Sequence, residues 1–206
     1  KRKVFILVVS YKKHMYRKRN NELVILALYL GDYSKQLYLR EISKKAEIPV
    51  KTCYSALLTL EKDNILKSTI RGKNKYFKLN LLDIQTKSYL LQAEIYKTTL
   101  FLDKCPIFKT FLKEVNTNNT IVVFGSFARF AQDKDSDLDF LIIKEEDYTL
   151  PLHLLPYNTH RIELSKESFL KSLEAQEILI KEIEENHVLL NNHSFYVNTM
   201  WGYYGK

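Results

Sequence analysis

At 206 residues, with 46% hydrophobic and 27% charged residues, the chain is long enough for one large or two small globular domains. Its two cysteines, Cys53 and Cys105, form no C-x-x-C motif, which excludes a disulfide framework and a cysteine-rich zinc site and favours a reducing cytoplasm. The apolar run at 4–9 is too short to cross a bilayer, so we expect no membrane partner. This run is either a β-strand or a stretch that precedes the natural start of the protein.

Charge is distributed unevenly along the chain. Residues 1–80 carry 19 Lys and Arg against 6 Asp and Glu, a net charge of +13, whereas the remaining residues carry a net charge of −5. A basic first part joined to an acidic second part indicates that any contact with nucleic acid belongs to the first part. We divide the chain into a basic N-terminal segment (1–19), a helical and hairpin domain (20–80), a connecting helix (81–105) and a C-terminal domain (106–206).

The first part of the basic domain has the apolar spacing of three helices. The pattern predicts helices over 21–30, 39–46 and 49–62. In the third, Cys53, Leu57 and Leu60 fall at i, i+4 and i+7 and should face the core. The helix should end at Asp63-Asn64, because asparagine tolerates the left-handed conformation.

A β-hairpin with a basic tip should follow. The runs 65–70 and 75–79 are rich in β-branched and aromatic residues, and they flank the tip at 71–74. On the pattern Leu39-Arg40-Glu41-Ile42, the helix end Leu57-Leu58-Thr59-Leu60-Glu61 and the strand Tyr76-Phe77-Lys78-Leu79, residues 20–80 resemble winged helix-turn-helix DNA-binding domains of archaeal and bacterial regulators. The resemblance implies DNA as a partner, contacted by the outer face of the third helix and by the wing. The residues expected to contact DNA are Lys51, Thr52, Tyr54, Ser55, Arg71, Lys73 and Lys75.

Residues 81–103 have near-helical apolar spacing that stops at Pro106, which predicts a long connecting helix. This helix could pack between the domains or against a second copy of the chain. Because winged-helix proteins often bind two half-sites as dimers, a homodimer is a further hypothesis.

The most specific motif is Gly125-Ser126 followed, after ten residues, by Asp137-Leu138-Asp139. The run 120–124 predicts a buried strand, after which Gly125 turns the chain and permits close approach of a phosphate. A helix that starts at this turn would direct its positive end at the phosphate. Along the next strand, 137–143, alternation places Asp137 and Asp139 on one face. Such a pair can hold Mg²⁺ together with phosphate oxygens.

The stretch Val123-Phe124-Gly125-Ser126-Phe127-Ala128-Arg129 and the stretch Ser136-Asp137-Leu138-Asp139-Phe140 resemble the polymerase β-like nucleotidyltransferase superfamily, in particular its minimal branch. The resemblance implies an α/β domain with a small mixed sheet, so that the whole chain is of the α+β class. It also implies that Gly125, Ser126 and Arg129 bind a nucleoside triphosphate, with ATP as the expected one. The family usually has glycine where this chain has Phe130, so the turn there must differ or be strained.

The family completes its metal site with a third carboxylate on a later strand. The resemblance assigns this role to Glu163, with Ile162 and Leu164 facing the core, so that Asp137, Asp139 and Glu163 would hold Mg²⁺ or Mn²⁺ and form the catalytic set. The family more often has aspartate at this position. An acidic cluster that follows the second strand supplies weaker candidates for the third ligand, because such a cluster is more often a solvated loop; its members are Glu145, Glu146 and Asp147.

Ser165 is expected to cap a helix that runs to about residue 185 and covers the sheet. His187 and His193 lie in the C-terminal tail without acidic residues at ligand spacing, so we assign them structural roles.

Two functions remain open from the sequence. In the first, the protein binds DNA and transfers a nucleoside monophosphate to a hydroxyl acceptor, which could be a partner protein, because minimal nucleotidyltransferases of this type are known from toxin–antitoxin pairs. In the second, it is a non-catalytic transcription regulator that uses a degenerate nucleotidyltransferase domain for nucleotide sensing or association.

Overall fold

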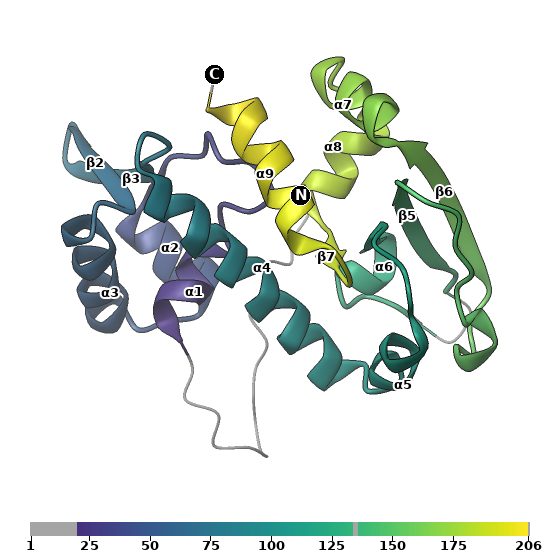
Figure 1. The fold of residues 1–206 in the computed structure, drawn as a ribbon. Coiled ribbons are helices and arrows are strands. Elements are labelled where there is room, and N and C mark those ends of the chain that lie inside the picture. Colours follow the sequence, from purple (N-terminus) through teal and green to yellow (C-terminus); the bar gives the residue numbers. More distant parts are fainter. Residues whose placement is uncertain (1–19, 134–135, 206) are drawn as a thin grey trace.

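The computed structural model describes residues 20–133 and 136–205, so the N-terminal segment 1–19 and its run at 4–9 lie outside the described residues. Figure 1 shows helices and a hairpin at one end, a second sheet at the other, and a long helix that crosses between them. In the described ranges, no helix is long and apolar enough to cross a membrane. Cys53 and Cys105 are both free and buried.

The N-terminal unit (residues 20–80) is built from three short helices and a three-stranded sheet. Its elements are α1 (Asn21–Leu26), β1 (Leu37–Tyr38), α2 (Leu39–Ala46), α3 (Val50–Lys62), β2 (Leu66–Arg71) and β3 (Asn74–Leu79). The strands are antiparallel in the order β1-β3-β2. The helices and the hairpin expected from the sequence are present, and Cys53, Leu57 and Leu60 are buried as expected. That this unit is a DNA-binding domain stays a prediction.

One boundary of the N-terminal unit differs from the expectation. The first helix ends at Leu26, and the chain continues in turns closed by bonds from Leu28 N–H to the Ile25 carbonyl and from Tyr29 N–H to the Leu26 carbonyl. The apolar spacing over 21–30 misled the prediction because these turns bury the same side chains as a helix would. By contrast, Asn64 ends α3 with φ of 58°, in the left-handed conformation expected of it.

The long connecting helix is α4 (Ile84–Lys104), followed by α5 (Ile107–Glu114). The C-terminal region then folds around a four-stranded mixed sheet in the order β6-β5-β4-β7, in which β5 and β6 are parallel and the other pairs are antiparallel. Its elements are β4 (Thr120–Phe124), α6 (Gly125–Ala128), β5 (Leu138–Lys144), the 3-10 helix η1 (Leu152–Leu154), β6 (Thr159–Ser165), α7 (Lys166–Glu174), α8 (Ile178–Glu185), β7 (Val188–Leu189) and α9 (His193–Tyr204).

The helix expected from Ser165 to about residue 185 is two helices. Ser165 caps α7 as expected, since its hydroxyl accepts a hydrogen bond from Ser168 N–H at 3.1 Å. The helix then breaks at Gln176, whose φ of 53° is left-handed, and α8 begins at Ile178. The break lets Phe169 and Leu173 of α7 and Ile180 and Ile183 of α8 all enter the core.

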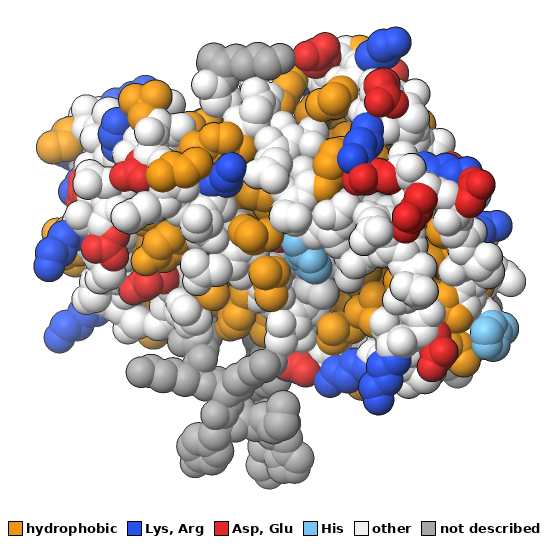
Figure 2. Space-filling view, viewed as in Figure 1, with side chains coloured by type: hydrophobic (Ala, Val, Ile, Leu, Met, Phe, Trp, Pro, Cys, Tyr) orange, Lys and Arg blue, Asp and Glu red, His pale blue; other side chains and the backbone are white. Residues whose placement is uncertain are grey.

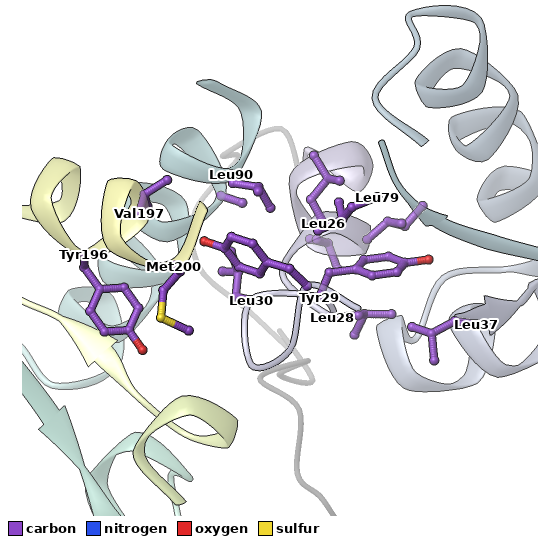
Figure 3. Packing of buried hydrophobic residues seen from close by; sticks show 14 of the residues in the cluster. Leu26, Leu28, Tyr29, Leu30, Leu37, Leu79, Leu90, Tyr196, Val197 and Met200 are labelled. Carbon is purple, nitrogen blue, oxygen red and sulfur yellow. The ribbon is translucent and has the colours of Figure 1, made fainter. Parts of the chain in front are cut away.

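Apolar side chains on the two faces of the C-terminal sheet belong to two different clusters. Leu138, Phe140 and Ile142 of β5 join the cluster under α5, whereas Leu141 and Ile143 join the larger cluster that also contains the core of the N-terminal unit. Figure 3 shows this larger cluster, which runs from Leu28 and Tyr29 of the N-terminal unit through Leu30 to Met200 and Tyr196 of α9. The two ends of the molecule therefore share one continuous core.

Buried polar groups accompany this shared core between α4 and the C-terminal helices. His187 Nε2 lies 2.8 Å from Glu94 Oε1, with both side chains fully buried, and His193 Nε2 lies 2.8 Å from the Thr98 hydroxyl. Although burial opposes ionisation, His187 and Lys97 hold the pKa of Glu94 below its ordinary value. These contacts agree with the structural roles that the sequence assigned to the two histidines.

Candidate functional site

The Gly-Ser turn and the second aspartate lie next to each other because of strand register. Phe124, the last residue of β4, is paired with Asp139 of β5, so that the turn at Gly125 comes directly beside the Asp139 carboxylate. Gly125 has φ of +67°, and a Cβ at this position would lie 2.2 Å from Asp139 Oδ2. Glycine is therefore required twice, for the backbone conformation and for the space that the carboxylate occupies.

The environment of Asp139 is partly desolvated and contains a second carboxylate. Burial raises the pKa of Asp139 above its ordinary value, and the negative charge of Asp137 adds to the effect. His160 opposes it, since its Nδ1 lies 3.6 Å from Asp139 Oδ1. Asp137 itself is exposed at the entry to β5. Two carboxylates held close in a polar, half-buried site favour a bound cation that relieves their repulsion.

Glu163 does not join the two aspartates. In the parallel pairing of β5 with β6, Asp139 is opposite His160, whereas Glu163 is opposite Ile142. Because side chains alternate along a strand, Glu163 lies on the face of the sheet opposite to Asp139. There its Oε1 accepts a hydrogen bond from the Tyr148 hydroxyl at 2.6 Å. Burial and this bond raise the pKa of Tyr148 to about 12.

The expectation that Glu163 completes a three-carboxylate site is therefore not met. The expectation for its neighbours holds, because Ile162 and Leu164 pack on the larger core cluster. Both outcomes follow from the alternation of side chains along β6. Because Ile162 and Leu164 face the larger core cluster beside Leu141 and Ile143, Glu163 between them must point to the other face of the sheet. The sequence reasoning missed His160, the residue that register places beside Asp139, because imidazole is not the expected donor for Mg²⁺.

The acidic cluster after β5 takes part in structural contacts. Glu146 accepts hydrogen bonds from Asn118 N–H and from the Thr117 hydroxyl, Glu145 pairs with Lys166 at 2.6 Å, and Asp147 pairs with Lys144 at 2.9 Å. These side chains follow the far end of β5, about 25 Å along the strand from Asp137. They are not part of the site.

Arg129 follows the short helix α6 and is held by an ion pair. Its Nη1 lies 3.0 Å from Glu182 Oε1 of α8, with both side chains partly exposed. It also lies near enough to favour the charged form of Asp139, although burial dominates and the pKa of Asp139 is raised. Since α6 contains only four residues, its helix dipole is small. A phosphate at this turn would therefore interact with the nearby backbone N–H groups rather than with the field of a full helix.

Phe130 occupies the position where glycine was expected and adopts the glycine conformation. Its φ is 51°, which is left-handed and costs a non-glycine residue about 1–2 kcal/mol. The ring packs 5.9 Å from the Phe101 ring, and Lys104 Nζ lies 4.1 Å from the ring centre. The predicted strain is present, and the packing of the ring offsets it.

The residues proposed to contact DNA fall into two groups. Lys51, Thr52, Tyr54 and Ser55 are all exposed on α3. At the wing, Arg71 and Lys73 are exposed, but Lys75 is engaged, since its Nζ lies 2.7 Å from Glu61 Oε2 and 5.2 Å from the centre of the Phe77 ring. Lys75 points back toward α3, so the structure leaves it less suited to a phosphate than its neighbours.

A strand that ends in a Gly-Ser turn thus lies beside two aspartates, one just before the next strand and one on it. Residues 105–195 match the family model described as a nucleotidyltransferase domain. The match includes β4, β5, β6 and both aspartates. No curated protein and no solved structure matched the chain.

In the described part of the chain, no three His, Cys, Asp or Glu side chains are arranged to hold a metal ion by themselves. The donor set nevertheless fits Mg²⁺, which commonly uses one or two carboxylates and completes its shell with water and substrate phosphate. The space that Gly125 leaves for Asp139 Oδ2 is consistent with this use, because it keeps that carboxylate at the turn where a phosphate would approach.

Proposed function

We propose that the C-terminal region, residues 106–206, transfers a nucleoside monophosphate from a nucleoside triphosphate to a hydroxyl acceptor. The observation that carries the proposal is the position of the Asp139 carboxylate against the glycine of the Gly-Ser turn, with Asp137 nearby. The match to the nucleotidyltransferase family model supports it. The expected triphosphate is ATP.

In this proposal Asp137 and Asp139 hold Mg²⁺ or Mn²⁺, which would neutralise phosphate charge as it develops. Gly125 and Ser126 bring backbone N–H groups and a hydroxyl to the phosphates. Arg129 contributes a positive charge once it leaves Glu182. The acceptor oxygen bonds to the α-phosphorus, pyrophosphate departs with the electrons of the broken bond, and the acceptor proton passes to solvent. The acceptor is a hydroxyl of a protein, a small molecule or a nucleic-acid end; a protein acceptor would fit a toxin–antitoxin pair.

The test uses radiolabelled ATP, CTP, GTP and UTP with Mg²⁺ or Mn²⁺, with the protein alone and with candidate acceptors. Wild-type protein should show metal-dependent binding of one triphosphate, seen as a melting shift, and release of pyrophosphate once the acceptor is present. Asp137→Asn with Asp139→Asn should lose both. Glu163→Gln is the matched control, since it removes a carboxylate from the opposite face of the same sheet. Loss of binding in Glu163→Gln but not in the double variant would refute the assignment.

For the N-terminal unit, the proposal is a winged-helix domain that binds duplex DNA. The order of elements, the basic composition and the exposed polar face of α3 support it. The residues proposed to contact DNA are those expected from the sequence except Lys75, which pairs with Glu61. A fluorescence-anisotropy titration with duplex DNA should give salt-dependent binding that Arg71→Gln with Lys73→Gln weakens. Affinity without salt dependence would count against this role.

One observation favours a second function for the same helix. Three apolar side chains recur at four-residue intervals along the exposed face of α3: Val50 is 50% exposed, Tyr54 44% and Leu58 40%. Such a stripe is typical of a face that contacts another helix. In this alternative the protein is a non-catalytic regulator that associates through α3, with itself or with a partner. Light scattering after size exclusion, comparing wild type with Leu58→Ser, would show a dimer lost in the variant.

A further inference from the structure

We propose that the solvent-facing side of the sheet β1-β3-β2 binds single-stranded nucleic acid. This surface, which we call the outer sheet face, consists of Tyr38, Lys67, Thr69, Arg71, Tyr76 and Lys78. It is separate from the exposed side of α3 proposed for duplex DNA, and of the wing residues proposed to contact duplex DNA it includes only Arg71. The inference goes beyond the proposed nucleotidyl transfer and does not depend on it.

The outer sheet face is defined by strand register. Phe77 and Leu79 of β3 and Leu66 of β2 are buried against the helices, so the alternate residues of the same strands point to solvent. Lys67 lies directly opposite Lys78, and Thr69 lies directly opposite Tyr76. Tyr38 lies opposite Tyr76 on the other side, so the two tyrosines are cross-strand neighbours in the middle of the face.

The charges on this face are of one sign. It carries Lys67, Arg71 and Lys78 and no carboxylate, and none of the ion pairs among the described residues engages either lysine. Lys75 of the same hairpin, on the inward face, is paired with Glu61. Figure 2 shows Lys and Arg side chains along the left outline of the molecule, over α3 and the β2–β3 hairpin, with apolar and acidic side chains among them.

The pairing of Lys67 with Lys78 requires an explanation. Like charges directly opposite each other on antiparallel strands destabilise a sheet. Lysines often protect the edge strand of a sheet from association, but Lys78 lies on β3, the central strand. A phosphate bound between the two ammonium groups would remove their repulsion, so charge complementarity points to an anionic partner.

Aromatic rings and a cavity indicate that the anion is a nucleic acid. The Tyr38 and Tyr76 rings are 5.8 Å apart, and the Arg71 guanidinium lies 5.9 Å from the Tyr76 ring centre. At the lysine end of the face is a cavity of about 350 Å³, lined by Lys67, Lys78, Asn80, Leu81 and Leu82 among others. Leu82 is 87% exposed there. Apolar walls next to lysines suit a base and its phosphate.

A single strand fits this surface better than a duplex. Tyrosine rings reach the faces of bases only when these are unstacked, as in single strands, and such stacking combined with a basic track is how sequence-tolerant proteins bind them. From Lys67 to Arg71 the strand rises about 13 Å, the length of about four stacked nucleotides. The face is therefore long enough for a short site of the size that small binding domains use.

The test titrates the full chain with a fluorescein-labelled oligothymidylate of about 12 nucleotides and with a duplex of the same length. Lys67→Gln with Lys78→Gln should weaken single-strand binding and reduce the slope of log affinity against log salt by about 1.4. Tyr76→Leu should weaken it at least about fivefold and leave the slope unchanged. Neither change should affect duplex binding through α3. Lys113→Gln with Lys171→Gln is the matched control, because it removes the same charge from the C-terminal region.

Several results would overturn the inference. These are absence of single-strand binding at low salt, equal weakening by the two double-lysine variants, or a duplex bound as tightly as the single strand by the same side chains. A thermal melt separates misfolding from lost contact: removing the like-charge pair should not lower the melting temperature of the Lys67→Gln, Lys78→Gln variant. Loss of binding together with a large drop in melting temperature would assign these lysines a structural role and refute the proposal.

Discussion

Replacing Gly125 with alanine tests whether the Gly-Ser turn and Asp139 form one unit. A non-glycine residue at φ of +67° costs about 1–2 kcal/mol in backbone strain. The new Cβ would also lie 2.2 Å from Asp139 Oδ2, so the carboxylate must rotate away, which adds about 0.5–1.5 kcal/mol of side-chain strain. We therefore expect a total loss of about 1.5–3.5 kcal/mol in the free energy of unfolding.

A double-mutant cycle separates the two contributions. In an Asp139→Ala background the Cβ meets no carboxylate, so Gly125→Ala should cost only the backbone part, about 1–2 kcal/mol. The coupling energy between the two positions should then be about 1 kcal/mol, which urea denaturation can measure. Independently, a displaced Asp139 should weaken metal-dependent nucleotide transfer about 100-fold, since an error of about 1 Å in a reacting group has effects of this size. Equal costs in both backgrounds with unchanged metal dependence would refute the reasoning.

Three further predictions follow from single residues. Phe130→Gly should be more stable to urea than Phe130→Ala by about 1 kcal/mol, because both variants lose the ring and only glycine is relaxed at φ of 51°. A more stable Phe130→Ala would show that the turn rearranges. Burial raises the pKa of Glu184 to about 7, so ionising this side chain lowers the stability of the folded protein as pH rises from about 4.5 to 7. Glu184→Gln should therefore be more stable to unfolding than wild type by at most about 3 kcal/mol at pH 8 and equally stable at pH 4. A stability difference that does not change with pH would contradict this. Tyr148→Phe should remove the hydrogen bond to Glu163 without changing metal affinity measured by Mn²⁺ titration, and lost affinity would show that this face serves the site.

The sequence predicted the strands, the turn and the pair of aspartates because each depends on local pattern. The β-branched run 120–124, the glycine that follows and the alternation around Leu138 are short-range signals, and β4, α6 and β5 begin within one residue of where these place them. Phe130 was also informative: in the place of a turn glycine it meant that the turn had to differ or be strained, and the structure has the strained φ.

The position of Glu163 could not be predicted in the same way. The sequence indicates that it lies on a strand between two core-facing residues, but the register of β6 on β5 depends on which core residues meet across the sheet. A shift of one residue exchanges the two faces of a strand, so the question of whether Glu163 or His160 accompanies Asp139 is decided by tertiary packing. The break at Gln176 has the same origin, since helix propensity continues through it and only the packing of α7 and α8 on the sheet requires it.

The shared core also connects the N-terminal unit to the candidate site in the C-terminal region. Residues 20–80 and 106–206 each have their own sheet, yet Tyr29 and Leu30 pack in the same cluster as Tyr196 and Met200. The contact continues at the backbone, where a Cβ on Gly31 would lie 2.9 Å from the Glu184 carbonyl of α8. The same helix holds Arg129 of the candidate site through Glu182. Because α8 contacts both the N-terminal unit and the turn proposed to bind nucleotide, a movement of Arg129 toward a phosphate would release the ion pair that ties α8 to this turn, while the contact of α8 with Gly31 of the N-terminal unit stays in place.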